Sequence, residues 1–217
     1  MAGLFIRHAA ARSNSLTIVS FDNHPDWDIR PPKWACGGWL SRAIRLPTVA
    51  SASVWGCGNF ELRFPARLFA TRSNRLKIHA WAQRQPPSVQ RRFDCMTAAN
   101  WRDRFADFAT TLQRRDIYIT VDLDCLRAEE SVTNWENGLF TAAEVAWAIS
   151  KLRQSANLIA ADLCGARSPA SYARFRQRFA ANWDHPKIPA IDSDRAMTIN
   201  RQALQIIWPA LTDSHDP

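Results

Sequence analysis

The sequence predicts a single α/β domain of three layers, in which a mostly parallel, doubly wound β-sheet lies between two layers of helices. Short apolar runs rich in β-branched residues alternate along the chain with longer segments whose apolar residues recur at helical spacing. Such alternation is typical of parallel sheets with helices on both faces. The length of 217 residues and the hydrophobic fraction of 47% suit one large domain, so we expect residues 1–217 to form a single domain.

Five segments have the composition expected of buried strands. The run from Leu16 to Phe21 is the clearest, because it is apolar and β-branched over most of its length and a polar motif follows it. A second run ends in a Gly-Cys-Gly turn, and a third precedes the helix breakers Pro86 and Pro87. The predicted strands are 16–21, 53–57, 76–81, 117–121 and 158–163.

Helices are predicted between these strands. Trp101, Phe105 and Phe108 recur on one face of a segment that leads into the fourth strand. Thr141 and Glu144 match a capping box, in which the hydroxyl and the carboxylate satisfy free backbone N–H groups at the start of a helix. The predicted helices are 3–12, 100–114, one that begins after Thr141, 172–181 and 200–208.

The charge and the cysteines narrow the classes of function. The net charge is +8, but it comes almost entirely from arginines spread along the whole chain, which argues against a nucleic-acid-binding tail or stripe. The five cysteines form no C-x-x-C pair, and the N-terminus has no signal peptide, so we expect a cytoplasmic protein with free thiols. No apolar run approaches the about 20 residues that cross a bilayer, so no membrane association is expected. A homo-oligomer is left open.

Two of the predicted strands end in acidic motifs. The first strand is followed by D-x-H-x-D, with Asp22, His24 and Asp26, and the fourth by D-x-D, with Asp122 and Asp124. Alternate residues of an extended chain share a face, so each motif can present its side chains together. In parallel sheets, ligands bind beyond the carboxyl ends of the strands. We therefore expect the two motifs to converge at one edge of the sheet.

These side chains are suited to a divalent cation. Several carboxylates gathered at the end of a hydrophobic sheet would repel one another, and one or two metal ions would offset that repulsion. Oxygen ligands with a single nitrogen favour Mn²⁺, with Zn²⁺ as the alternative if one compact site forms. In the competing interpretation, Asp22 and Asp122 only close strands and His24 is an ordinary loop histidine. The presence of two separate strand-end motifs favours the metal site.

The two motifs resemble those of the superfamily of arginases, agmatinases and histone deacetylases, in which one strand ends in D-x-H-x-D and a later strand in D-x-D. The segment 133–139 is similar to the family's loop before a capped helix, and 158–163 resembles its next strand. The resemblance covers about residues 4–165. It implies a three-layer fold and a metal-activated water that attacks a planar carbon bonded to nitrogen in a small-molecule substrate.

The resemblance also implies a role for each matching residue. Asp22 and Asp122 would bridge two metal ions, His24 and Asp124 would complete one site, and Asp26 would belong to the other. Asp26 and Asp124 are further expected to take part in catalysis. Cys36 lies near the position where the arginine-type enzymes carry a proton-shuttling histidine, so it is predicted either to transfer protons or merely to pack.

Two departures from the family pattern affect the metal site and the substrate. The family's two-metal enzymes have a further histidine ligand in a G-G-x-H segment before D-x-H-x-D, and the sequence begins too late to contain that segment. Either the true start and an N-terminal strand lie upstream, or one metal site is weakened; a single-metal, deacetylase-like site of Asp22, His24 and Asp124 would survive. The guanidinium-binding glutamate that follows 158–163 in the family is also absent, which argues against a guanidine substrate.

The sequence as a whole therefore predicts a metal-dependent hydrolase. Its substrate would be a small, non-guanidine molecule with a C–N bond, such as an amide. The alternative is a catalytically silent member of the same fold that binds a metal ion or a partner without turnover.

Overall fold

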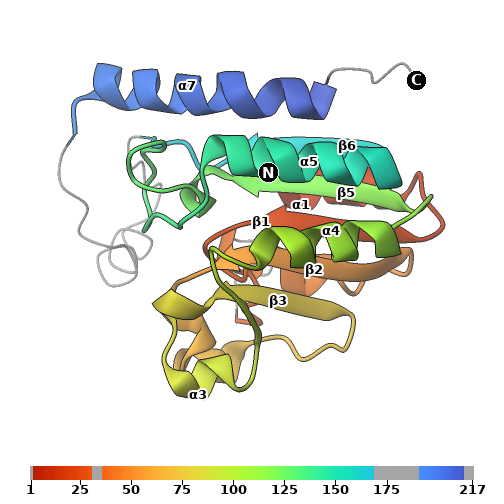
Figure 1. Ribbon diagram of the computed structural model, residues 1–217. Helices are drawn as coiled ribbons and strands as arrows, with labels where there is room; N and C mark the ends of the chain where they lie inside the picture. The colour runs from red at the N-terminus through yellow and green to blue at the C-terminus, as the bar shows by residue number, and fades with distance from the viewer. Residues whose placement is uncertain (1, 31–35, 169–190, 213–217) are drawn as a thin grey trace.

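The computed structural model describes residues 2–30, 36–168 and 191–212 (Figure 1). Its centre is a six-stranded sheet with the order β4-β3-β2-β1-β5-β6, in which every neighbouring pair of strands is parallel. The predicted parallel α/β sheet is therefore confirmed. The strands are β1 (Leu16–Phe21), β2 (Val49–Cys57), β3 (Leu76–Trp81), β4 (Asp94–Met96), β5 (Asp116–Asp122) and β6 (Asn157–Cys164).

Helices cover both faces of this sheet (Figure 1). On one face α4 packs beside α5, and α7 packs on α5, while α1 and α2 lie together on the other face. The described helices are α1 (Ala2–Ala10), α2 (Trp39–Ala43), α3 (Pro87–Gln90), α4 (Trp101–Thr111), α5 (Ala142–Ser155) and α7 (Ser193–Thr212). Short 3₁₀ turns lie at η1 (Cys36–Gly38), η2 (Phe60–Leu62), η3 (Ala66–Phe69), η4 (Ala82–Arg84) and η5 (Leu123–Cys125).

Strand β1 explains why the sheet carries a core on each side. All six of its residues are buried, and successive side chains point to opposite faces. Val19 and Phe21 belong to the core under α4 and α5, whereas Leu16 and Ile18 belong to the core under α1 and α2. A strand covered on both faces needs a nearly continuous apolar sequence, which is the pattern that predicted it.

The predicted elements agree with the structure at most positions. β1 and β3 have the predicted bounds, and Thr141 and Glu144 form both hydrogen bonds of the predicted capping box at the start of α5. The last helix is longer than predicted, and β4, α2 and α3 were not predicted. These three elements are only three to five residues long, too short for a periodic pattern. The predicted helix 172–181 lies outside the described residues.

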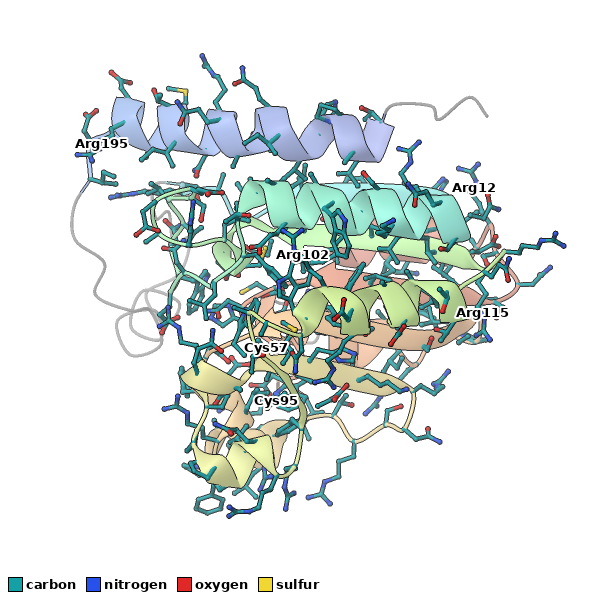
Figure 2. All side chains as sticks on the ribbon, in the orientation of Figure 1. Arg12, Cys57, Cys95, Arg102, Arg115 and Arg195 are labelled. Carbon is teal, nitrogen blue, oxygen red and sulfur yellow. The ribbon has the colours of Figure 1, made fainter. Side chains whose placement is uncertain are left out.

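The surface charge follows the scattered arginines. Figure 2 shows Arg195 at one end of the view, Arg102 near its middle, and Arg12 and Arg115 at the other end. In the described part of the chain, no helix is long and apolar enough to cross a membrane. That residues 1–217 form one domain stays a prediction.

The strand order brings the two acidic motifs together. β1 lies between β2 and β5, and Phe21, its last residue, pairs with Val121 of β5 and with Trp55 of β2. The residues after Phe21 and Val121 therefore leave the sheet side by side at its carboxyl edge, as predicted from the rule for parallel sheets.

Candidate metal centre

Asp22, His24 and Asp124 form a compact group, which we call the Asp-His-Asp cluster. One ligand atom from each of the three lies within 4.8 Å of the others. Nδ1 of His24 is 2.7 Å from Oδ2 of Asp124 and 3.7 Å from Oδ1 of Asp22. All three residues are buried, with exposed fractions of 4%, 8% and 1%.

Backbone hydrogen bonds fix the two aspartates of this cluster. Oδ1 of Asp22 accepts the His24 N–H at 2.7 Å, so the chain turns sharply after β1 and brings the imidazole back toward the carboxylate. Oδ1 of Asp124 accepts the Asn23 N–H at 3.1 Å, which joins the turn after β1 to the turn after β5. Asp124 lies in η5, and its backbone N–H donates to Oδ1 of Asp122, the N-cap residue of this turn, at 3.0 Å.

The electrostatics of the cluster favour a bound cation. Burial, followed by repulsion from Asp124, raises the pKa of the Asp22 carboxyl well above its usual value. Burial and Asp124 likewise raise the pKa of Asp122 to about 7. Burial opposes protonation of His24, but the charge of Asp124 and the surrounding hydrogen bonds outweigh it and raise the pKa of this imidazole. A divalent cation would replace the protons that these groups retain, so the residues fit a metal ion.

The other two predicted ligands have different contacts. Asp26 has a left-handed backbone, with φ of 48°, and its Oδ2 accepts a hydrogen bond from Nε1 of Trp39. Oδ1 of Asp122 caps η5, and its Oδ2 accepts from Sγ of Cys164 at 3.4 Å. The structure therefore brings three of the five predicted ligands into one group, and metal binding by all five stays a prediction.

A pocket of about 660 Å³ opens beside the cluster, with His24 on its wall. The exposed Cys36 also lines this pocket, so its predicted choice between proton transfer and packing remains open. Two acids, Asp28 and Glu61, lie on the wall as well, and Asp28 is paired with Arg30. The aromatic side chains of the pocket are Trp27, Phe60, Phe64, Phe69 and Trp135.

Two residues at this site were not singled out from the sequence. Trp135 packs the edge of its ring against His24, with 5.4 Å between the ring centroids. Oε2 of Glu136 lies 3.4 Å from Nε2 of His24. Both lie in the segment noted for its similarity to the family's loop, and no charge spacing or periodicity marks either of them. Only the folded chain brings this loop next to His24, so the sequence does not show the contact.

Comparison with known proteins supports the fold assignment. No protein-family model matches the sequence, and no curated protein matches it. Proclavaminate amidino hydrolase from Streptomyces clavuligerus superposes with a TM-score of 0.55 at 17% identity, covering 96% of this chain and 60% of that one. Agmatine ureohydrolase of Thermoplasma volcanium superposes with a TM-score of 0.53 at 14% identity, covering 96% of this chain and 59% of that one.

The likeness to these two structures concerns the fold, because both identities are low. The chain spans about three-fifths of the length of each of them. The resemblance predicted from the D-x-H-x-D and D-x-D motifs is thus confirmed at the level of architecture: the chain has the three-layer α/β/α fold of the arginase-like ureohydrolases.

Proposed function

We propose that the protein is a metal-dependent hydrolase that cleaves a C–N bond in a small, non-guanidine molecule. The observation that carries this proposal is the buried Asp-His-Asp cluster beside a pocket of about 660 Å³. The two superposed proteins are an amidino hydrolase and a ureohydrolase, which supports the same class. An amide is the simplest substrate of this kind.

One ion, held by Asp22, His24 and Asp124, accounts best for the compact arrangement. Two carboxylates and one imidazole suit Mn²⁺ or Zn²⁺. Such an ion would lower the pKa of a water molecule toward neutrality and polarise a substrate carbonyl. The arrangement of two ions that includes Asp26 and Asp122 is the alternative, and neither of these carboxylates belongs to the compact group.

The residues of the chain would bind and orient the substrate. The aromatic wall of the pocket would exclude water and pack against the apolar part of the molecule. Asp124 and Asp26 would hold protons or charge near the reacting carbon, and Cys36 lies where a proton could be transferred along the pocket wall. The Mn²⁺ preference, the cytoplasmic location, the absence of nucleic-acid binding and the oligomeric state stay predictions.

The end of β6 supports a substrate other than a guanidine. Asp162 is the acid of this strand, and its carboxylate accepts hydrogen bonds from Tyr118 and, at 3.0 Å, from Thr120. Cys164 and Gly165 follow, and no residue of β6 is among the described residues that line the pocket. A guanidinium would therefore lack a carboxylate partner from this strand.

Metal binding by isosteric variants tests the proposal. We expect the purified protein to bind about one equivalent of Mn²⁺ or Zn²⁺ in calorimetry, and Asp22→Asn and Asp124→Asn each to abolish binding while remaining folded. Asp107→Asn, on the exposed face of α4, makes the same chemical change and should bind as the wild type does. The proposal is wrong if neither metal binds or if the cluster variants bind normally.

Activity assays then separate the two functional alternatives. A panel of amides, ureides and guanidines should yield turnover of an amide or ureide that requires the metal ion. Metal binding without turnover of any of them would select the catalytically silent alternative.

A further inference from the structure

We propose that Glu136 is a positioning residue that accepts a hydrogen bond from Nε2 of His24 and thereby directs Nδ1 of that ring toward the metal ion. This inference rests on the proposed function, because it assumes that the Asp-His-Asp cluster binds a metal. It concerns a residue outside that cluster, on the loop between η5 and α5.

The two nitrogens of His24 face different surroundings. Nδ1 points at Asp124 and Asp22, 2.7 Å and 3.7 Å away. Nε2 is buried and makes no hydrogen bond within the described part of the chain, and Oε2 of Glu136 lies 3.4 Å from it. The Glu136 side chain is 45% exposed, so a small rotation would bring it into hydrogen-bonding geometry.

Metal binding makes this contact necessary. A neutral imidazole has one N–H, so a metal ion on Nδ1 places the proton on Nε2. A buried N–H without an acceptor is unfavourable, and Glu136 is a carboxylate already within reach. Metal-binding histidines generally donate their second N–H to a carboxylate or carbonyl, which fixes the tautomer and the ring orientation. Glu136 lies beside Nε2 and is not part of the Asp-His-Asp cluster around Nδ1, so we do not count it among the ligands.

The loop that carries Glu136 is joined to both metal-binding turns. The carbonyl of Glu136 accepts from Nδ2 of Asn23 at 2.9 Å, and Asn23 lies between Asp22 and His24. Two residues later, the Gly138 N–H donates to the carbonyl of Asp124 at 2.6 Å. The backbone position of Glu136 is therefore set by the same turns that hold the ligands.

Three further contacts fix the shape and position of this loop. A Cβ on Gly138 would lie 2.3 Å from the carbonyl oxygen of Cys125, so only glycine permits the approach. Nδ2 of Asn137 donates to Oγ of Ser131 at 2.7 Å and closes the loop on itself. Trp135 packs edge-on against His24 with an interplanar angle of 68°, which restricts rotation of the imidazole.

Metal affinity measured with matched variants tests the role of Glu136. In competition titrations with Mn²⁺ and with Zn²⁺, Glu136→Ala and Glu136→Ser should bind about 10- to 100-fold more weakly than the wild type. Glu136→Gln keeps an acceptor oxygen and should recover part of this loss. Glu129→Gln removes the same charge from an exposed position of the same loop and should have no effect.

A spectroscopic readout distinguishes positioning from general damage to the fold. In the Zn²⁺-loaded protein with ¹⁵N-labelled histidine, the Nε2 proton of His24 should be slow to exchange in the wild type and in Glu136→Gln. It should exchange rapidly in Glu136→Ala and in Glu136→Ser, whose metal-free thermal unfolding should match that of the wild type.

Each outcome has a definite meaning. Equal metal affinity and equal Nε2–H protection in the wild type and in either short-side-chain variant would overturn the inference while leaving the metal site intact. Failure of the wild type itself to bind metal would instead refute the proposed function. If Glu136→Ala does not fold, Glu136→Ser provides the same comparison.

Discussion

Two buried histidines, each close to an aspartate, lie in different parts of this sheet and have opposite electrostatics. His24 follows β1, where Asp124 and its neighbours raise the pKa of the imidazole despite its burial. His79 lies in β3, 2.9 Å from Asp94, yet burial, with smaller contributions from Arg104 and Lys77, lowers its pKa to about 3. A nearby carboxylate therefore does not by itself show that a histidine belongs to a metal site.

The surroundings of the two rings explain the difference. His79 stacks on Trp55, with 3.7 Å between the ring centroids, and Asp94 is half-exposed and paired with Arg104. The two carboxylates of the Asp-His-Asp cluster are buried, and no arginine or lysine is paired with either of them in the described residues. Uncompensated buried acids mark the candidate metal site, whereas an aromatic stack with a compensated acid marks a structural histidine.

The largest expected difference between the two sites is in metal affinity. His24→Phe removes a ligand and should reduce Mn²⁺ or Zn²⁺ affinity by more than the about 10- to 100-fold expected when a ligand loses its hydrogen-bond partner. His79→Phe removes a ring of the same kind from the same sheet and should leave the affinity unchanged. Isothermal calorimetry on both variants checks this, and equal losses in the two would show that the comparison is wrong.

The second largest expected effect is the change of metal affinity with pH. In the metal-free protein, burial and the charge of Asp124 raise the pKa of Asp22 well above its usual value of 3.8, so this group favours the folded state below pH 3.8 and its contribution is lost as the pH rises through the raised pKa. Metal binding needs ionised carboxylates and a deprotonated Nδ1, so affinity should rise about tenfold per pH unit for each proton released. Titrations from about pH 6 to pH 8 measure this; a pH-independent affinity would contradict the account of the cluster.

A smaller effect should appear in the stability of the His79 site. The pKa of His79 is lowered to about 3 in the folded state from 6.5, so the unfolded chain binds a proton that the folded chain does not, and stability falls as the pH drops from 6.5 toward 3. His79→Phe removes this cost and should be about 2 kcal/mol more stable than the wild type at pH 5, relative to their difference at pH 7. Urea unfolding of both proteins at the two pH values measures this difference. A variant that gains no stability over the wild type at the lower pH would contradict the prediction.

The smallest expected effect concerns Asp94, the aspartate beside His79. Asp94→Asn should change stability by no more than about 0.5 kcal/mol, because its carboxylate is half-exposed. It should also leave metal binding intact, whereas Asp124→Asn abolishes it. A large loss of stability in Asp94→Asn, measured by thermal unfolding, would indicate that the contact between His79 and Asp94 stabilises the fold.

The same contrast shows what sequence can predict here. The strands were predictable because burial on both faces demands continuous apolar runs, as in β1 and β5. Asp22, His24 and Asp124 were predictable because alternate residues at the ends of neighbouring parallel strands must converge. Their grouping follows from the spacing of residues at the strand ends, and this spacing can be read in the sequence.

Other features depend on contacts between distant segments and leave no such signature. Glu136 reaches His24 only because Asn23 and Gly138 join its loop to the two metal-binding turns. Asp26 follows the predicted spacing, but its left-handed backbone and its hydrogen bond from Trp39 give it contacts outside the Asp-His-Asp cluster. An extended chain would have presented Asp26 beside Asp22 and His24, but the chain already turns after β1, where Oδ1 of Asp22 accepts the His24 N–H.

Anomalous diffraction from crystals grown with Mn²⁺ or Zn²⁺ tests the central claim most directly. We predict one strong anomalous peak about 2 Å from Nδ1 of His24 and from carboxylate oxygens of Asp22 and Asp124, with Nε2 of the same ring within hydrogen-bonding distance of Glu136. A metal-loaded crystal with no peak between these three side chains would contradict the account.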